Sequence, residues 1–170
     1  MQITADVTLK GPVWAEMTDL LVTEYIPTYM DLYALSISIG MMYDSQIETD
    51  EMVPSGYKEN PRSIPRNVLI QSKNKSLLEF MLQAAIITTK HVEFTEQERL
   101  ELAFSEKTVE KFSPIQFLTK YANYGIVKIK EALSDADDVE LMQKMMSFLD
   151  SIYETGYDPT VDLELIAEEN

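Results

Sequence analysis

Few side chains in this sequence combine the type and the spacing that a catalytic site requires. The chain has one histidine, His91, and no cysteine. The lack of cysteine excludes thiolate catalysis, disulfide bonds and cysteine-ligated zinc. A serine triad would have to use His91, yet no Gly-x-Ser-x-Gly turn occurs among the five glycines. We interpret His91 as a loop histidine that follows a buried helix; a general base or a lone metal ligand is the less favoured alternative.

Carboxylates offer the remaining route to chemistry, through a bound metal ion. Asp44, Glu48 and Asp50 have the alternating spacing of a calcium loop, but Thr49 lies where that loop needs glycine. A solvated acidic turn is therefore the favoured interpretation. A second acidic group consists of Asp135, Asp137 and Asp138. Its place at the start of a predicted helix explains it, because carboxylates stabilise the positive end of a helix dipole.

Two further catalytic patterns are missing. None of the eleven lysines has an acidic residue two positions before it, which disfavours the commonest restriction-nuclease motif. Glycine-rich phosphate-binding loops of either common type are also absent from the sequence. We therefore predict no cofactor, no metal and no enzyme activity. A metal-dependent enzyme with carboxylate-only ligands remains an alternative.

The distribution of charge is the most informative feature of the sequence. From Glu131 to the end there are twelve acidic residues and one basic residue, Lys144, a net charge of −11. The whole chain carries −15, which leaves −4 for the first 130 residues. Such an anionic segment repels nucleic acid and anionic membrane and attracts a cationic protein surface or a metal ion. We expect the partner contacts to come from the acidic segment 158–170. They are Asp158, Asp162, Glu164, Glu168 and Glu169.

The pattern of apolar residues predicts a mainly α protein. Residues 2–10 alternate between apolar and polar side chains, as in a half-buried strand, and residues 161–168 do the same. The intervening sequence has helical periodicity, with capping boxes at Thr28 and Thr95 and a proline at the first position of a helix at Pro114. We predict a single domain over 1–170, a bundle of five to six helices. Its N- and C-terminal segments pair as a small two-stranded ribbon, and an exposed ribbon edge could also form a homodimer.

A basic region interrupts the helical pattern. Residues 58–75 contain five lysines and arginines against one acidic residue, together with two prolines, and we predict that most of this region is a loop. It lacks the aromatic residues that would stack on single-stranded nucleic acid. We expect it to neutralise acidic segments of the same chain or to dock an acidic face of a partner. Direct nucleic-acid binding is not expected.

Two glycines lie inside predicted helices. Gly40 and Gly125 should each cost about 1 kcal/mol relative to alanine in a helix, so a structural gain must offset that cost. We predict that they permit a close helix crossing, and we assign Tyr121 and Asn123 to the same structural site. A small pocket between the two helices is the functional alternative.

The segments around these glycines resemble a known family. Residues 29–40 (YMDLYALSISIG) and 117–126 (FLTKYANYGI) are similar to paired segments of small accessory proteins encoded beside bacterial DNA-phosphorothioation (Dnd) and related restriction systems. In that family a basic stretch tends to follow the first glycine, whereas residues 44–51 are acidic here. The resemblance implies a defence-associated accessory protein without established catalytic residues.

These observations lead to one function and two alternatives. We expect a cytoplasmic, non-enzymatic subunit of a bacterial DNA-modification, restriction or anti-phage defence system that docks a basic protein surface of a DNA-processing complex. No stretch of the sequence is long and apolar enough to cross a membrane. An acidic DNA mimic that inhibits a DNA-binding enzyme is one alternative, and the carboxylate-ligated metal enzyme is the other.

Overall fold

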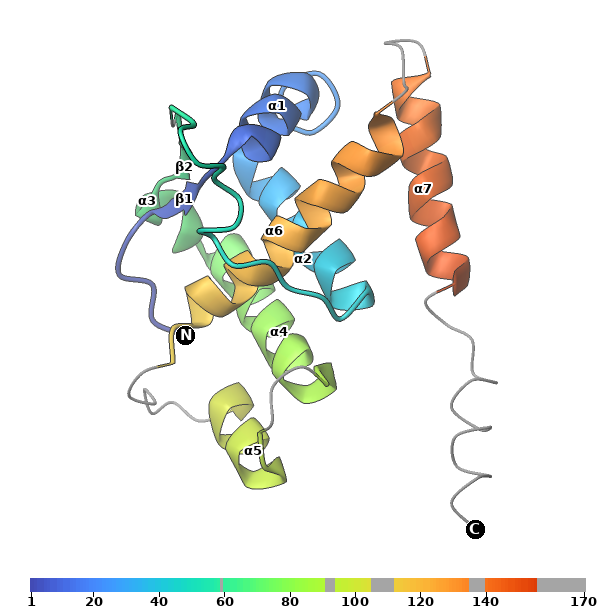
Figure 1. The fold of residues 1–170 in the computed structure, drawn as a ribbon. Helices are drawn as coiled ribbons and strands as arrows, with labels where there is room; N and C mark the ends of the chain where they lie inside the picture. Colours follow the sequence, from blue (N-terminus) through green and yellow to red (C-terminus); the bar gives the residue numbers. More distant parts are fainter. Residues whose placement is uncertain (59, 91–93, 105–111, 135–139, 156–170) are drawn as a thin grey trace. The chain divides into compact units, whose positions relative to one another are not determined.

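The structure is a computed structural model that describes residues 1–58, 60–90, 94–104, 112–134 and 140–155. Its described part is mainly α, with seven helices and one two-stranded antiparallel sheet (Figure 1). The elements in chain order are β1 (Val7–Leu9), α1 (Pro12–Leu21), α2 (Tyr29–Met42), β2 (Arg62–Ile64), α3 (Arg66–Leu69), α4 (Ser72–Thr88), α5 (Glu96–Phe104), α6 (Pro114–Leu133) and α7 (Leu141–Thr155). The prediction of a mainly helical fold is confirmed. The predicted count of five to six helices is too low, because the short helix α3 forms within a region predicted to be mostly loop.

The sheet corrects the predicted pairing of the two chain ends. β1 pairs with β2 in the antiparallel register Val7 to Ile64 and Leu9 to Arg62. β2 comes from the basic region 58–75, most of which we predicted to be loop, and the same region also forms α3 and the start of α4. The alternation along 2–10 identified a strand, but periodicity alone does not identify a partner. The predicted C-terminal strand, 158–170, lies outside the described residues.

Local contacts explain why β2 and α3 form where they do. Val7 and Ile64 are both buried, so the register places apolar side chains on the same face. At the start of α3, the Arg66 backbone N–H donates to Asp6 Oδ1 at 2.7 Å, and Arg66 Nε donates to the Ile3 carbonyl at 2.9 Å. A basic residue thus holds the N-terminal segment against the sheet.

Three helix starts lie where the sequence signals predicted them. Thr28 Oγ1 accepts the backbone N–H of Asp31 at 3.2 Å at the start of α2. The same capping arrangement starts α5, where Thr95 Oγ1 accepts the backbone N–H of Glu98 at 3.3 Å. α6 begins at Pro114, as predicted. α2 is buried along most of its length, consistent with its apolar sequence.

The chain divides into two compact units, residues 1–130 and residues 131–170. In the first unit α5 packs against α4, and Arg99 Nη1 of α5 donates to the Ile86 carbonyl at 2.6 Å. The apolar sequence of residues 77–89 predicts a buried helix, yet two of its side chains are exposed, Phe80 by 67% and Ile87 by 49%. The described part of the second unit is the end of α6 together with α7.

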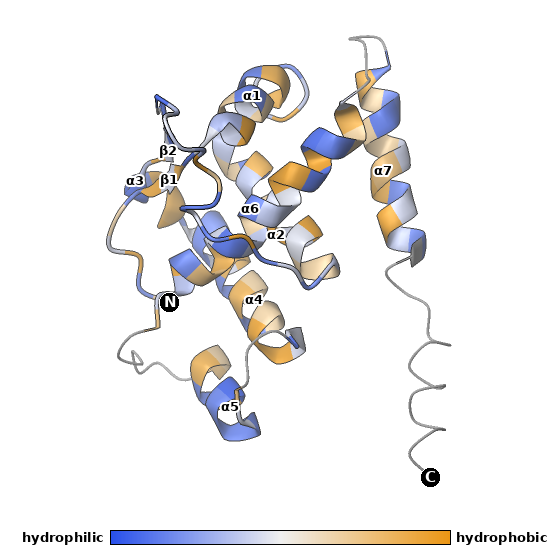
Figure 2. Ribbon diagram, viewed as in Figure 1, coloured by the Kyte–Doolittle hydropathy of each residue, from blue (hydrophilic) through white to orange (hydrophobic). Residues whose placement is uncertain are grey.

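The buried face of α7 differs from the one predicted by its sequence pattern. The apolar spacing of residues 139–153 predicts a buried stripe that includes Met142, Met146 and Tyr153, but all three are exposed. The buried residues are their neighbours Leu141, Met145 and Ile152. Both sets have helical spacing and consist of apolar or aromatic side chains, and hydrophobic residues recur along the length of α7 (Figure 2), so the pattern could not tell which stripe is buried.

Candidate functional site

Helices α2 and α6 cross with their backbones in contact. A Cβ atom added at Gly40 would lie 2.1 Å from the Tyr121 carbonyl oxygen, and one at Gly125 would lie 1.9 Å from the Ser36 carbonyl oxygen. Gly40 therefore meets Tyr121 while Ser36 meets Gly125, so the two helices run in opposite directions past each other. No side chain fits between these backbones. The two glycines that the sequence analysis singled out, Gly40 and Gly125, lie at this crossing. The space beside each glycine is occupied by the backbone of the other helix.

Asn123 of α6 connects the crossing to α1 and to the segment after α2. Its Oδ1 accepts the indole N–H of Trp14 at 2.9 Å, and its Nδ2 donates to the Ile47 carbonyl at 3.1 Å and to Thr49 Oγ1 at 3.4 Å. Trp14 and Asn123 are both almost completely buried. Because the amide is engaged on both its oxygen and its nitrogen, its role here is to position neighbouring segments.

Two buried tyrosines lie beside the crossing. The Tyr33 hydroxyl is 2.9 Å from Thr119 Oγ1, and Thr119 Oγ1 itself lies 2.7 Å from the Ile115 carbonyl, to which it donates. The Tyr121 hydroxyl donates to Asp44 Oδ1 at 3.1 Å. Burial raises the pKa of both phenols above their ordinary value. Both side chains therefore stay protonated at neutral pH and serve as hydrogen-bonding groups of the core.

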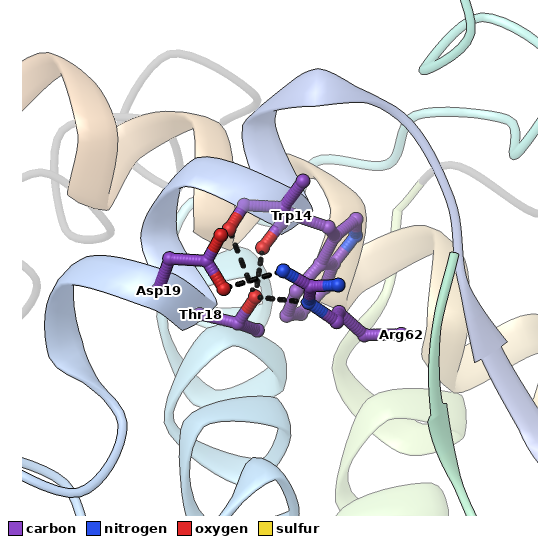
Figure 3. A network of polar contacts seen from close by, with 5 residues as sticks. Trp14, Thr18, Asp19 and Arg62 are labelled. Atoms are coloured by element: carbon purple, nitrogen blue, oxygen red, sulfur yellow. Dashed lines mark hydrogen bonds and ion pairs between the residues drawn. The ribbon is translucent and has the colours of Figure 1, made fainter. Parts of the chain in front are cut away.

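The basic region is engaged in contacts within the chain. Arg62 of β2 forms an ion pair with Asp19, and its Nε donates to Thr18 Oγ1 at 3.3 Å (Figure 3). Thr18 Oγ1 in turn donates to the Trp14 carbonyl at 2.7 Å. The hydrogen bond to Asp19 raises the pKa of Arg62. With Arg62 bound to α1 and Arg66 bound to Asp6 and Ile3, these two cations hold the sheet in place.

The carboxylates that resembled a calcium loop do not converge. Asp44 accepts hydrogen bonds from the Tyr121 hydroxyl and from the Lys90 backbone N–H, and Glu48 forms an ion pair with Lys120. Across the described ranges, no three acidic or histidine side chains are grouped closely enough to hold a metal ion. His91 lies outside the described residues. So do Asp135, Asp137 and Asp138, and the predicted partner contacts Asp158, Asp162, Glu164, Glu168 and Glu169.

One surface was missed by the sequence prediction. α7 exposes Met142, Met146 and Tyr153 on one side, next to the exposed carboxylates of Asp150 and Glu154. The available signal was that α7 has enough apolar residues for two stripes, whereas a helix that packs on one side needs one. The second stripe is a candidate contact surface.

Comparisons do not extend these observations to known proteins. No family model, no curated protein and no solved structure matches this chain. Within the described residues, no helix has both the length and the apolar character needed to cross a bilayer. The features that bear on function are therefore the charge of the chain and the surfaces described above.

Proposed function

We propose that this protein is a cytoplasmic, non-enzymatic interaction subunit that docks a basic protein partner through its acidic C-terminal segment, residues 131–170. The observation that carries the proposal is the net charge of −11 on this segment, against −4 on the rest of the chain. A segment with one cation among twelve carboxylates cannot neutralise itself. A cationic partner surface supplies the missing charge and accelerates encounter.

The first unit supports the proposal by contrast. Its cations are paired with carboxylates at several places: Arg62 with Asp19, Lys120 with Glu48 and Lys130 with Glu16 join different segments, and Lys75 pairs with Glu79 within α4. These pairs neutralise part of the charge of residues 1–130 within the chain. Lys144 of α7 pairs with Glu140, which directly precedes the helix, at 3.5 Å, while Asp150 and Glu154 are exposed.

The resemblance of the α2 and α6 segments to accessory proteins of DNA-phosphorothioation systems indicates the kind of assembly. We propose a complex that modifies, restricts or otherwise processes DNA in bacterial defence. A DNA-processing enzyme has a basic surface by necessity, because it binds phosphates. An acidic subunit could then act on such an enzyme without binding DNA itself.

The proposal is tested by capturing the tagged protein from its native cells and identifying co-purified proteins by mass spectrometry. The affinity for the purified partner is then measured at several salt concentrations. Replacing Asp162, Glu164, Glu168 and Glu169 with lysine should weaken binding and reduce its salt dependence. A matched control replaces Glu24, Asp50, Glu51 and Glu96, four exposed acidic residues of the first unit, with lysine.

Each outcome discriminates between the hypotheses. Lost binding in the first variant and retained binding in the control support docking through the acidic segment. If both variants bind the partner with the same affinity and the same salt dependence as the wild type, docking through the acidic segment is contradicted. A partner that is released by competing duplex DNA would instead favour a DNA mimic.

A further inference from the structure

Helix α7 has two apolar stripes, and the outer one is exposed. Leu141, Met145 and Ile152 are at most 8% exposed. Met142, Met146 and Tyr153 are exposed by 44%, 59% and 79%. Residues four and seven positions apart lie on the same side of a helix, so these three side chains form one continuous stripe. Burying it would remove a substantial apolar area from water.

The outer stripe has an acidic edge. Met142, Met146, Asp150 and Glu154 follow one another at intervals of four residues and therefore form a single row along α7. The row is apolar in the first half of the helix and acidic in the second, and all four side chains are exposed. Tyr153 lies beside the acidic half and offers a large apolar ring with a polar end.

The charges decide what kind of molecule can cover this stripe. A second copy of α7 would bring another acidic edge and another segment with a net charge of −11, and like charges at an interface are unfavourable. A nucleic acid or an anionic membrane is repelled for the same reason. A protein groove with apolar walls and a basic rim satisfies both halves of the row.

We infer that α7 is the docking element of the acidic segment and that it inserts Met142, Met146 and Tyr153 into an apolar groove of a basic protein. This inference rests on the proposed function and assigns its contact surface. Lysine or arginine residues at the groove rim pair with Asp150 and Glu154. The mode is that of an amphipathic helix in a groove, for which anchors at spacings of four and seven are typical. Methionine is suited to such a surface because its side chain adapts to the shape of the groove.

Photo-crosslinking of the full-length chain in its native cells tests the inference. Benzoylphenylalanine is introduced in place of Met146 and, separately, in place of Tyr153. A matched control carries it in place of Phe80, an equally exposed apolar residue of α4. Mass spectrometry of the crosslinked peptides identifies both the partner and the residue that was contacted. We expect both α7 positions to capture the same protein, at apolar residues neighboured by lysine or arginine, and position 80 not to capture it.

Binding measurements with that purified partner complete the test. Met146→Lys should weaken binding by about tenfold or more, as for a central interface anchor, whereas Phe80→Lys should leave it unchanged. Circular dichroism verifies that both variants keep their helices. Crosslinks from position 146 to a second copy, to this same chain or to no protein overturn the inference. If charge reversal of Asp162, Glu164, Glu168 and Glu169 abolishes partner binding but Met146→Lys leaves it unchanged, the proposed function stands and the assignment of the contact to α7 is wrong.

Discussion

The helix crossing and α7 use the same residue types in opposite ways. At the crossing, Tyr33 and Tyr121 are 0% and 1% exposed and their hydroxyls bond to polar groups of the core. On α7, Tyr153 is 79% exposed. Methionine shows the same contrast, since Met30 of α2 is buried and Met146 is exposed. Residue type alone therefore does not distinguish a core position from an exposed one in this chain. The exposure of each tyrosine or methionine depends on its tertiary surroundings.

The sharpest way to break the crossing is to add one methyl group. Gly125→Ala places a Cβ atom 1.9 Å from the Ser36 carbonyl oxygen. The α6 backbone fixes the position of the Cβ atom and the oxygen is itself a backbone atom, so neither can rotate away. Helix propensity alone should make the alanine variant about 1 kcal/mol more stable. Any decrease in the free energy of unfolding is therefore caused by the clash. We expect the free energy of unfolding to fall by about 3–5 kcal/mol in urea denaturation, because the two helices must separate.

A second glycine provides the control for that substitution. An alanine Cβ at Gly56 would meet no atom within 4 Å, but the backbone there has a φ of +80°. Gly56→Ala should therefore cost only about 1 kcal/mol, from the left-handed conformation. Equal losses at the two positions would contradict the close approach of α2 and α6.

Asn123→Ala should produce the next largest loss. The substitution removes the acceptor of the Trp14 indole N–H and the donor to the Ile47 carbonyl, and it leaves a small void. We expect a loss of about 3 kcal/mol in the free energy of unfolding. Combining it with Trp14→Phe should cost less than the sum of the two single changes, because both remove the same hydrogen bond. Additive costs would mean that this bond contributes little.

The sequence predicted local structure better than it predicted partners. Capping boxes at Thr28 and Thr95 and the proline at Pro114 each mark a helix start, because these signals depend on residues within one turn. The two glycines could be singled out because glycine inside a helix is unfavourable unless another backbone lies close by. Asn123 was grouped with them, but its bonds to Trp14 and Ile47 could not be predicted, since they join residues far apart in the sequence.

The sequence did not predict the partner of the N-terminal strand or the buried face of α7. The strand at 2–10 was expected to pair with the C-terminal segment, whereas its partner is β2, in a region whose prolines and charges indicated a loop. A strand of three residues leaves little periodicity to detect. On α7 the two stripes are equally apolar in sequence, so their exposure depends on tertiary packing.

The assignment of the two α7 stripes can be tested at adjacent methionines. Met145 is 8% exposed and Met146 is 59% exposed. Met145→Ala should lower the free energy of unfolding by about 2–3 kcal/mol because it leaves a cavity. Met146→Ala should change it by less than about 0.5 kcal/mol. Urea unfolding followed through the helical signal compares the two, and the reverse order of effects would place the other stripe in the core.

The smallest predicted effect concerns the start of α5 in the first unit. The Thr95 backbone N–H and hydroxyl both donate to Glu98 Oε2, at 2.8 and 2.7 Å, and these bonds hold the pKa of Glu98 below its usual value. A carboxylate with a lowered pKa in the folded state stabilises the fold above the unfolded-state pKa of about 4.3, and the contribution is lost as the pH falls through the folded-state pKa. Glu98→Gln should therefore melt at a lower temperature than the wild type at neutral pH, and the difference should shrink in acid. Glu96→Gln, which removes an exposed carboxylate from the same turn, is the control. If the melting temperature of Glu98→Gln stays below that of the wild type by the same amount at every pH, the charge of the capping carboxylate contributes nothing.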